Sequence, residues 1–257
     1  MQAPQSVPAF PARSRLRPLA LALSLLIAAP AWAGDVCDLT TAGENGAGAS
    51  APGSNSLACG TNASASAGGV ALGASSVATF ESTALGTSAL ATGNGSTAIG
   101  TWRDLNNDGL VGLDEITIAS AQRTTAVGAA AQATNDFATA LGGNATASGW
   151  ASIAIAGNAS GEAGIAIMGD ATGSHGIAMG RSSRATGDRS TANGLYAEST
   201  GSDSTALGGY NYADGRRGTA IGHSSRAGGD GSTAVGNDAS ATGDRAIAIG
   251  EYSEAGG

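Results

Sequence analysis

A short sequence unit returns about every fourteen residues through most of this 257-residue chain. Each unit has an alanine between two larger residues and then a glycine, as in Thr83-Ala84-Leu85-Gly86 and Thr97-Ala98-Ile99-Gly100. The central alanines are Ala58, Ala71, Ala84, Ala98, Ala126, Ala140, Ala154, Ala166, Ala178, Ala192, Ala206, Ala220, Ala234 and Ala248. Most steps are 14 residues, two are 13, two central ones are 12 and one is 28. A fixed period this short indicates a solenoid built from one structural unit per repeat.

The length of the repeat limits the cross-section of the solenoid. Fourteen extended residues have a contour of about 46 Å, enough for two short strands and two tight turns. Three-sided parallel helices need about eighteen residues per coil, so a two-sided roll is expected. A second alanine seven residues after the first and a turn glycine two residues later, such as Ala91 and Gly93, mark the other strand and its turn. The predicted fold class is all-β, a parallel β-roll of about 14 residues per coil. The two 12-residue steps predict tighter or irregular coils over residues 152–180.

The composition of the repeat predicts a thin core. Alanine occupies the inward positions, and aromatic residues make up only 4% of the chain. At about 25 cal/mol per Å², such a coil buries too little apolar area to offset the entropy of ordering its chain. We therefore expect a second apolar face to be buried between copies of the chain.

The first 33 residues are predicted to be a signal peptide. Three arginines within residues 13–17 precede an apolar run of 11 residues, Leu19 to Ala29. Ala31-Trp32-Ala33 then offers small residues at the two positions that a signal peptidase reads. A membrane-spanning helix is the alternative, but it needs about 20 apolar residues. Cleavage after Ala33 would leave nine basic and twenty acidic residues, a net charge of −11.

The charge and the side-chain chemistry narrow the function classes. A net negative chain opposes binding to nucleic acid and to anionic lipid, which depend on Lys and Arg. The two histidines, His175 and His223, belong to different coils and have no neighbouring nucleophile or metal-spaced partner, so no enzymatic activity is expected. Seven arginines between Arg181 and Arg245 alternate with aspartates, which predicts a mixed-charge edge with ion pairs between coils or, alternatively, a surface for an acidic partner.

The two cysteines lie near the predicted mature N-terminus. Cys37 falls in a cap segment, residues 34–55, and Cys59 falls in the first coil. In an exported protein an even cysteine count favours a disulfide, here closing the N-terminal loop over the first coil. A buried thiol at Cys59 is the alternative, and pairing between chains stays open.

The 28-residue step contains an insertion, predicted over residues 101–124, that carries a calcium-type loop. Residues 104–115 fit the twelve-residue EF-hand pattern position by position. The predicted Ca²⁺ ligands are Asp104, Asn106 and Asp108, the carbonyl of Leu110 and a bidentate Glu115. Gly109 would make the sharp turn. Alternatively, the segment is a degenerate coil in which Gly112 stands in the alanine position.

The repeat resembles the head repeats of YadA-like trimeric autotransporter adhesins. The segment Ser82-Thr83-Ala84-Leu85-Gly86-Thr87-Ser88-Ala89-Leu90-Ala91-Thr92-Gly93 follows that pattern throughout, and the resemblance covers residues 56–257. It implies a left-handed parallel β-roll assembled as a homotrimer and displayed at the bacterial surface. It also implies a virulence role in attachment to host extracellular matrix, such as collagen, or to a cell-surface receptor. The stalk and outer-membrane anchor of that family are not among these residues, so we expect a fragment or a truncated product.

Two other functions fit a flat solenoid. Threonines such as Thr83, Thr97 and Thr205 recur at one position of the repeat, as they do in solenoids that bind ice or crystal surfaces. A passive spacer that holds other domains away from the membrane is the third possibility.

Overall fold

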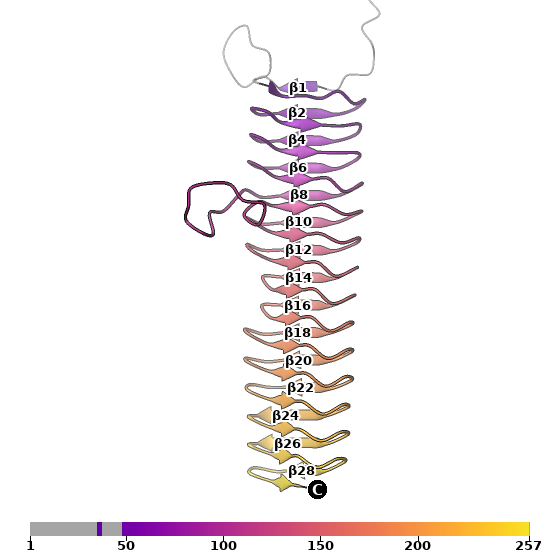
Figure 1. Cartoon of the computed structure of the whole chain (residues 1–257), viewed down its shortest axis with the longest axis vertical. Coiled ribbons are helices and arrows are strands. Elements are labelled where there is room, and N and C mark those ends of the chain that lie inside the picture. The colour runs from indigo at the N-terminus through magenta and orange to yellow at the C-terminus, as the bar shows by residue number, and fades with distance from the viewer. Residues whose placement is uncertain (1–34, 38–47, 257) are drawn as a thin grey trace, which may run out of the picture. The chain divides into compact units, whose positions relative to one another are not determined.

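The computed structural model describes residues 35–37 and 48–256, and these form a column of parallel β-coils (Figure 1). The predicted signal peptide, residues 1–33, lies outside the described residues, as do residues 38–47 of the predicted cap segment. Each regular coil gives one strand to each of two sheets. Among the described residues, no helix is long and apolar enough to cross a bilayer.

The first sheet, sheet A, contains the longer strands, of three or five residues, typified by Thr-Ala-Leu. Its strands, in spatial order, are β1 (Asp35–Cys37), β2 (Leu57–Cys59), β4 (Val70–Leu72), β6 (Thr83–Leu85), β8 (Thr97–Ile99), β10 (Thr125–Val127), β12 (Thr139–Leu141), β14 (Ile153–Ile155), β16 (Ile165–Ile167), β18 (Ile177–Met179), β20 (Thr191–Asn193), β22 (Thr205–Leu207), β24 (Thr219–His223), β26 (Thr233–Asn237) and β28 (Ile247–Ile249).

The second sheet, sheet B, contains the shorter strands. They are β3 (Ser64–Ala65), β5 (Val77–Ala78), β7 (Leu90–Ala91), β9 (Ile118–Ala119), β11 (Gln132–Ala133), β13 (Thr146–Ala147), β15 (Asn158–Ala159), β17 (Asp170–Ala171), β19 (Arg184–Ala185), β21 (Glu198–Ser199), β23 (Tyr212–Ala213), β25 (Arg226–Ala227), β27 (Ser240–Ala241) and β29 (Glu254–Ala255). The predicted two-sided parallel roll is thus confirmed.

The register keeps identical positions of the repeat in contact from coil to coil. Ala84 pairs with Ala98, and Ala98 pairs with Ala126 across the insertion. The inward alanines of both sheets are buried, and apart from Ile116 every buried hydrophobic side chain in the described part of the chain is alanine. Because alanine is small, the two sheets enclose a thin core.

The two sheets differ on their outer faces. From β6 onward, the first outward position of sheet A carries threonine or isoleucine, and the second carries Leu85, Ile99, Val127, Leu141, Ile155, Ile167, Met179, Asn193, Leu207, Ile221, Val235 and Ile249. The outward positions of sheet B are mostly polar from Gln132 onward, namely Gln132, Thr146, Asn158, Asp170, Arg184, Glu198, Tyr212, Arg226, Ser240 and Glu254. The second outward position of sheet A therefore forms an aliphatic row, whereas the outer face of sheet B is apolar at Val77, Leu90 and Ile118 and mostly hydrophilic from Gln132 onward.

The 12-residue steps shorten one turn and leave the strands regular. Four residues, 142–145, connect β12 to β13, whereas two residues, 156–157, connect β14 to β15. Ala156 takes the left-handed conformation, with φ of 50°. The coils labelled β14 and β16 are visibly narrower than their neighbours in Figure 1. The expected tighter coils are therefore present.

Close stacking of the coils requires glycine at the turn after sheet A. At Gly86, where φ is +120°, a Cβ atom would lie 1.9 Å from the carbonyl oxygen of Gly100 in the next coil. A side chain cannot occupy that space, which explains the glycine that follows most sheet A strands.

Candidate metal centre

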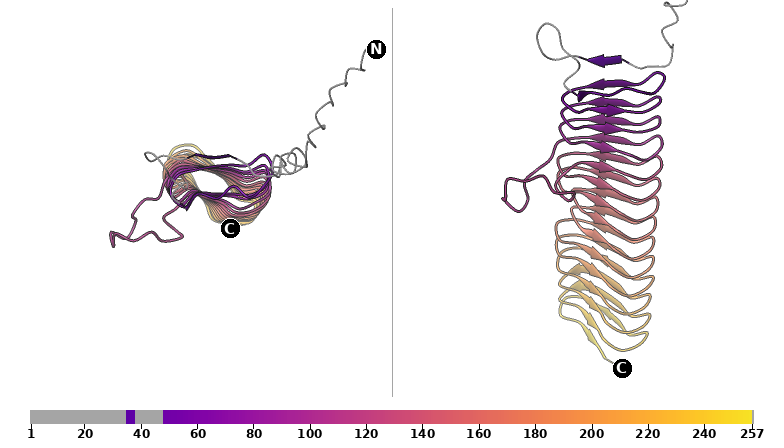
Figure 2. Two further views of the ribbon diagram at one scale, coloured as in Figure 1. Left: turned by 90° about the horizontal axis from the view of Figure 1, so that it is seen from above. Right: turned by 45° about the horizontal axis from the view of Figure 1, so that its top comes forward.

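The insertion leaves the column between β8 and β9. Figure 2 shows this segment standing outside the stacked coils. Strand β8 pairs directly with β10, and β9 pairs with β7 and β11. Residues 118–124 therefore belong to a regular coil, and the insertion is shorter than the predicted interval of residues 101–124. The degenerate-coil interpretation, with Gly112 in the alanine register, is wrong, because Ala98 pairs with Ala126 instead.

Hydrogen bonds hold the base of the insertion against the roll. The hydroxyl of Thr117 donates to the carbonyl oxygen of Gly128 at 2.7 Å, and the same hydroxyl oxygen lies 3.2 Å from the carbonyl oxygen of Thr101. The N–H of Arg103 donates to the carbonyl of Glu115 at 2.7 Å, which joins the two arms of the insertion. The loop is thus fixed where it leaves the roll.

Glu115 organises the loop from a fully buried position. Its Oε2 accepts a hydrogen bond from the N–H of Gly112 at 2.9 Å, and its Oε1 accepts from Leu105 at 2.8 Å and from Asn106 at 3.3 Å. These backbone donors, Gly112 first and then Leu105, lower the pKa of Glu115 below its ordinary value, although burial acts in the opposite direction. The side chain is therefore a carboxylate at neutral pH, anchored by three N–H groups.

Two further carboxylates gather beside Glu115. Ligand oxygens of Asp104, Asp108 and Glu115 all lie within 4.8 Å of one another. Oδ2 of Asp104 accepts from the N–H of Gly109 at 3.0 Å, while its Oδ1 is shielded from solvent and has no hydrogen-bond partner. A shielded carboxylate oxygen without a donor is costly unless a cation compensates it.

The other predicted ligands are connected to this cluster through Asp108. Asn106 accepts from the N–H of Asp108 at 3.0 Å and donates its amide to Oδ2 of Asp108, also at 3.0 Å. The N–H of Leu110 donates to Oδ1 of Asp108 at 2.7 Å, and the Leu110 side chain is exposed. The structure thus brings three predicted ligands together and places the remaining two in the same turn. The loop runs from β8 to β9 with no helix on either side among the described residues.

Two structural features were not predicted from the sequence. Thr117 anchors the insertion from the position that Ala131 and Ala145 occupy in the next two coils. A threonine in place of this alanine was the sequence feature that could have indicated the anchor. Aspartates at one turn position, such as Asp136 and Asp230, accept a hydrogen bond from the backbone N–H of the preceding coil.

The predicted disulfide involves β1. Its register places Cys37 opposite Cys59 in the neighbouring parallel strand. The side chain of Cys37 lies outside the described residues, so the disulfide stays a prediction.

The charged and aromatic side chains on the surface form contacts between coils. Three arginines make the expected ion pairs, Arg184 with Glu198, Arg189 with Asp203 and Arg226 with Asp214. His175 and His223 are both exposed, and His223 contacts the ring of Tyr210, which stacks on Tyr196.

Comparison with known families identifies the repeat. A family model described as the YadA head domain repeat (2 copies) matches residues 80–101, 119–145, 136–155, 171–197, 199–225 and 227–253. These matches leave out residues 104–115 and cover more than half of the chain. No curated protein matches the chain.

Proposed function

The chain belongs to the YadA head domain repeat family, and from this premise we propose that it is a non-catalytic adhesin head that works as a homotrimer at the bacterial surface. The family supports a surface-exposed, adhesin-like head. Attachment to host matrix, of the collagen type, or to a cell-surface receptor is the function that we assign to it.

The outer face of sheet A is the observation that carries the proposal. The interior of the roll buries alanine, while larger aliphatic residues such as Ile155 and Ile221 remain 38% and 37% exposed. Burying these side chains between chains would add the apolar area that the core lacks. The hydrophilic outer face of sheet B is then left for solvent and ligands.

Sedimentation equilibrium of the full chain tests the assembly. We expect a trimer, and replacement of Ile155 and Ile221 by glutamate should dissociate it, because charges would be buried at the interface. Tyr212→Glu, on the outer face of sheet B, is the matched control and should leave the trimer intact. A wild-type chain that stays monomeric, or a trimer disrupted equally by both changes, would contradict the proposal.

We also propose that the loop of residues 104–115 binds Ca²⁺ as a structural site. Support comes from the three converging carboxylates, from the partnerless Oδ1 of Asp104 and from oxygen as the donor type that Ca²⁺ prefers. A bound ion would offset the mutual repulsion of Asp104, Asp108 and Glu115 and hold the loop against the roll.

Calorimetry of the purified chain tests this site. We expect calcium to bind with one-site stoichiometry per chain, and Asp104→Ala combined with Asp108→Ala to abolish the heat. Asp114→Asn, an exposed neighbour outside the predicted ligand set, should bind as the wild type does. Absence of calcium heat, or heat that survives the double change, would overturn the site.

Adhesion competes with the two other functions of flat solenoids. Three isoleucines, Ile153, Ile165 and Ile177, interrupt the threonine positions of sheet A, which disfavours ice binding. Saturable binding of the purified chain to collagen or to cultured cells would support adhesion. Thermal hysteresis would favour ice binding, and the absence of both would favour a spacer.

A further inference from the structure

A glycine interrupts a row of large side chains on one edge of the roll. The turn that leads from sheet B into sheet A has one left-handed residue per coil, and in successive coils these are Arg189, Asp203, Arg217, Gly231 and Arg245. Backbone hydrogen bonds keep them in register, since Arg217, Gly231 and Arg245 each donate an N–H to the preceding coil. Because Gly231 has no side chain, a gap opens between Arg217 and Arg245.

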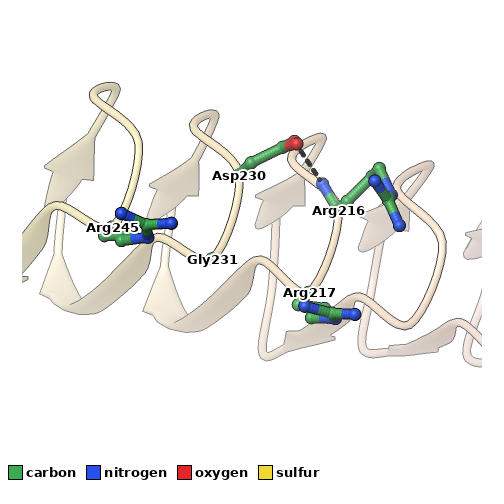
Figure 3. A pocket seen from close by; sticks show the side chains of 5 residues that line it. All are labelled: Arg216, Arg217, Asp230, Gly231 and Arg245. Atoms are coloured by element: carbon green, nitrogen blue, oxygen red, sulfur yellow. Dashed lines mark hydrogen bonds between the residues drawn. The ribbon is translucent and has the colours of Figure 1, made fainter.

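The gap is a surface hollow of about 190 Å³. Its lining residues are Arg216, Arg217, Asp230, Gly231 and Arg245. Figure 3 shows the side chains of Arg217 and Arg245 on either side of Gly231, with Asp230 directed toward the backbone of Arg216. A Cβ at Gly231 would have the Arg245 side chain 3.8 Å away as its nearest neighbour, so the hollow is open at its centre.

The charge in the hollow is unbalanced. Elsewhere in the same row, the guanidinium of Arg189 donates to both carboxylate oxygens of Asp203, at 2.6 and 2.8 Å. No ion pair forms at Arg216, Arg217 or Arg245 among the described residues. The single lining carboxylate, Asp230, accepts a hydrogen bond from the N–H of Arg216 at 3.1 Å. Three arginines therefore line the hollow with a single aspartate, in a chain that is acidic overall.

We propose that this hollow binds a sulfate-type oxyanion, either free or as a sulfate ester on a glycan. Guanidinium groups present planar pairs of N–H donors that match two oxygens of such an anion. Arg217 and Arg245 lie on either side of Gly231, and Arg216 adds a third positively charged residue to the lining. A sulfate group is small enough for the space that the missing Gly231 side chain leaves.

The biological role of this site rests on the proposed adhesin function. In that role, sulfated glycans would be a ligand class of the head. Assembly into a trimer would give three copies of the hollow, so a sulfated glycan that spans them would gain avidity. Binding of the probe by the chain in solution tests the hollow by itself, whereas matrix and cell attachment test the adhesin. The two can therefore fail separately.

Calorimetry with sodium sulfate and with a heparin-derived oligosaccharide, at constant ionic strength, tests the proposal. Fully desulfated oligosaccharide is the ligand control and should not bind. Arg217→Gln and Arg245→Gln should each weaken binding by about tenfold, as expected for loss of a charge-assisted hydrogen bond. Gly231→Gln should weaken it similarly by filling the hollow without changing the charge. The neighbouring coils show that this turn position accepts larger residues, as at Arg217 with φ of 54°.

Arg181→Gln is the matched control, because Arg181 is exposed, makes no ion pair among the described residues and lies outside the hollow. It should bind both probes as the wild type does. Binding of free sulfate would support a small-anion site, and binding of the oligosaccharide alone would support a glycan site. No binding of either probe would overturn the proposal. So would equal weakening by Arg181→Gln and Arg217→Gln, or full affinity in Gly231→Gln.

Discussion

Ala220 and Ile221 are adjacent on β24 and face opposite environments. Ala220 is completely buried between the two sheets, whereas Ile221 is 37% exposed on the outer face of sheet A. Each pairs with its counterpart in the next coil, Ala234 or Val235. The small residue therefore sets the thickness of the roll, and the large one forms the surface on which we place the partner chain.

We expect Ala220→Leu to destabilise the roll. The inward position has room for one methyl group, so three additional carbon atoms would push the sheets apart, at a cost of about 3 kcal/mol. Urea unfolding followed by circular dichroism measures this change. The matched variant, Ile221→Ala, should cost each chain much less and should instead weaken the trimer in sedimentation. Equal destabilisation by the two changes would contradict the division between an alanine core and an aliphatic interface.

We expect Gly86→Ala to disrupt stacking between neighbouring coils. Its Cβ would lie 1.9 Å from the carbonyl oxygen of Gly100, and φ of +120° is unfavourable for any residue with a side chain. Reduced unfolding stability and increased proteolysis near residues 86–100 should follow. Gly231→Ala is the control, because the nearest neighbour of the added Cβ there is the Arg245 side chain at 3.8 Å, an ordinary van der Waals contact. A Gly86→Ala protein as stable as this control would show that the coils can separate at low cost.

The repeat made the architecture predictable, because a local rule applied many times leaves little freedom. Alanine at positions such as Ala84 fixes the inward face, glycine at Gly86 fixes the approach of the next coil, and fourteen residues fit two strands and two turns. The residues that depart from the rule were harder to interpret. The sequence identified the carboxylates of the insertion, but their mutual distances depend on how Glu115 turns back onto the N–H groups of Leu105 and Gly112.

The arginine-rich edge was predictable from the sequence, but the hollow at Gly231 was not. Gly231 looks like an ordinary turn glycine, and its significance comes from Arg217 and Arg245, fourteen residues away on each side. Their proximity becomes visible only when the coils are stacked in register. The same applies to Thr117, whose hydroxyl connects the insertion to Gly128 in the next coil.

We expect Cys37 and Cys59 to form a disulfide in the exported protein. They stand opposite each other in adjacent parallel strands, and strands about 4.8 Å apart fall within the Cα separation that a disulfide bridges. Non-reducing peptide mapping should recover one peptide pair that links the two cysteines. Two other results would contradict this expectation: a covalent dimer on a non-reducing gel, or alkylation of both thiols in the folded protein.

Protonation of Glu115 should release the loop of residues 104–115 at low pH. Because backbone N–H groups lower its pKa in the folded chain, the carboxylate contributes stability above the ordinary glutamate pKa of about 4.3, and this contribution is lost as the pH falls through the lower folded value. In the presence of a chelator, hydrogen exchange over residues 104–115, measured relative to the intrinsic amide rate at each pH, should stay slow between about pH 7 and 5 and accelerate below about pH 4. Glu115→Gln should exchange rapidly throughout, while Asp114→Asn should follow the wild type. Acceleration of exchange already between about pH 7 and 5 would show that Glu115 does not anchor the loop.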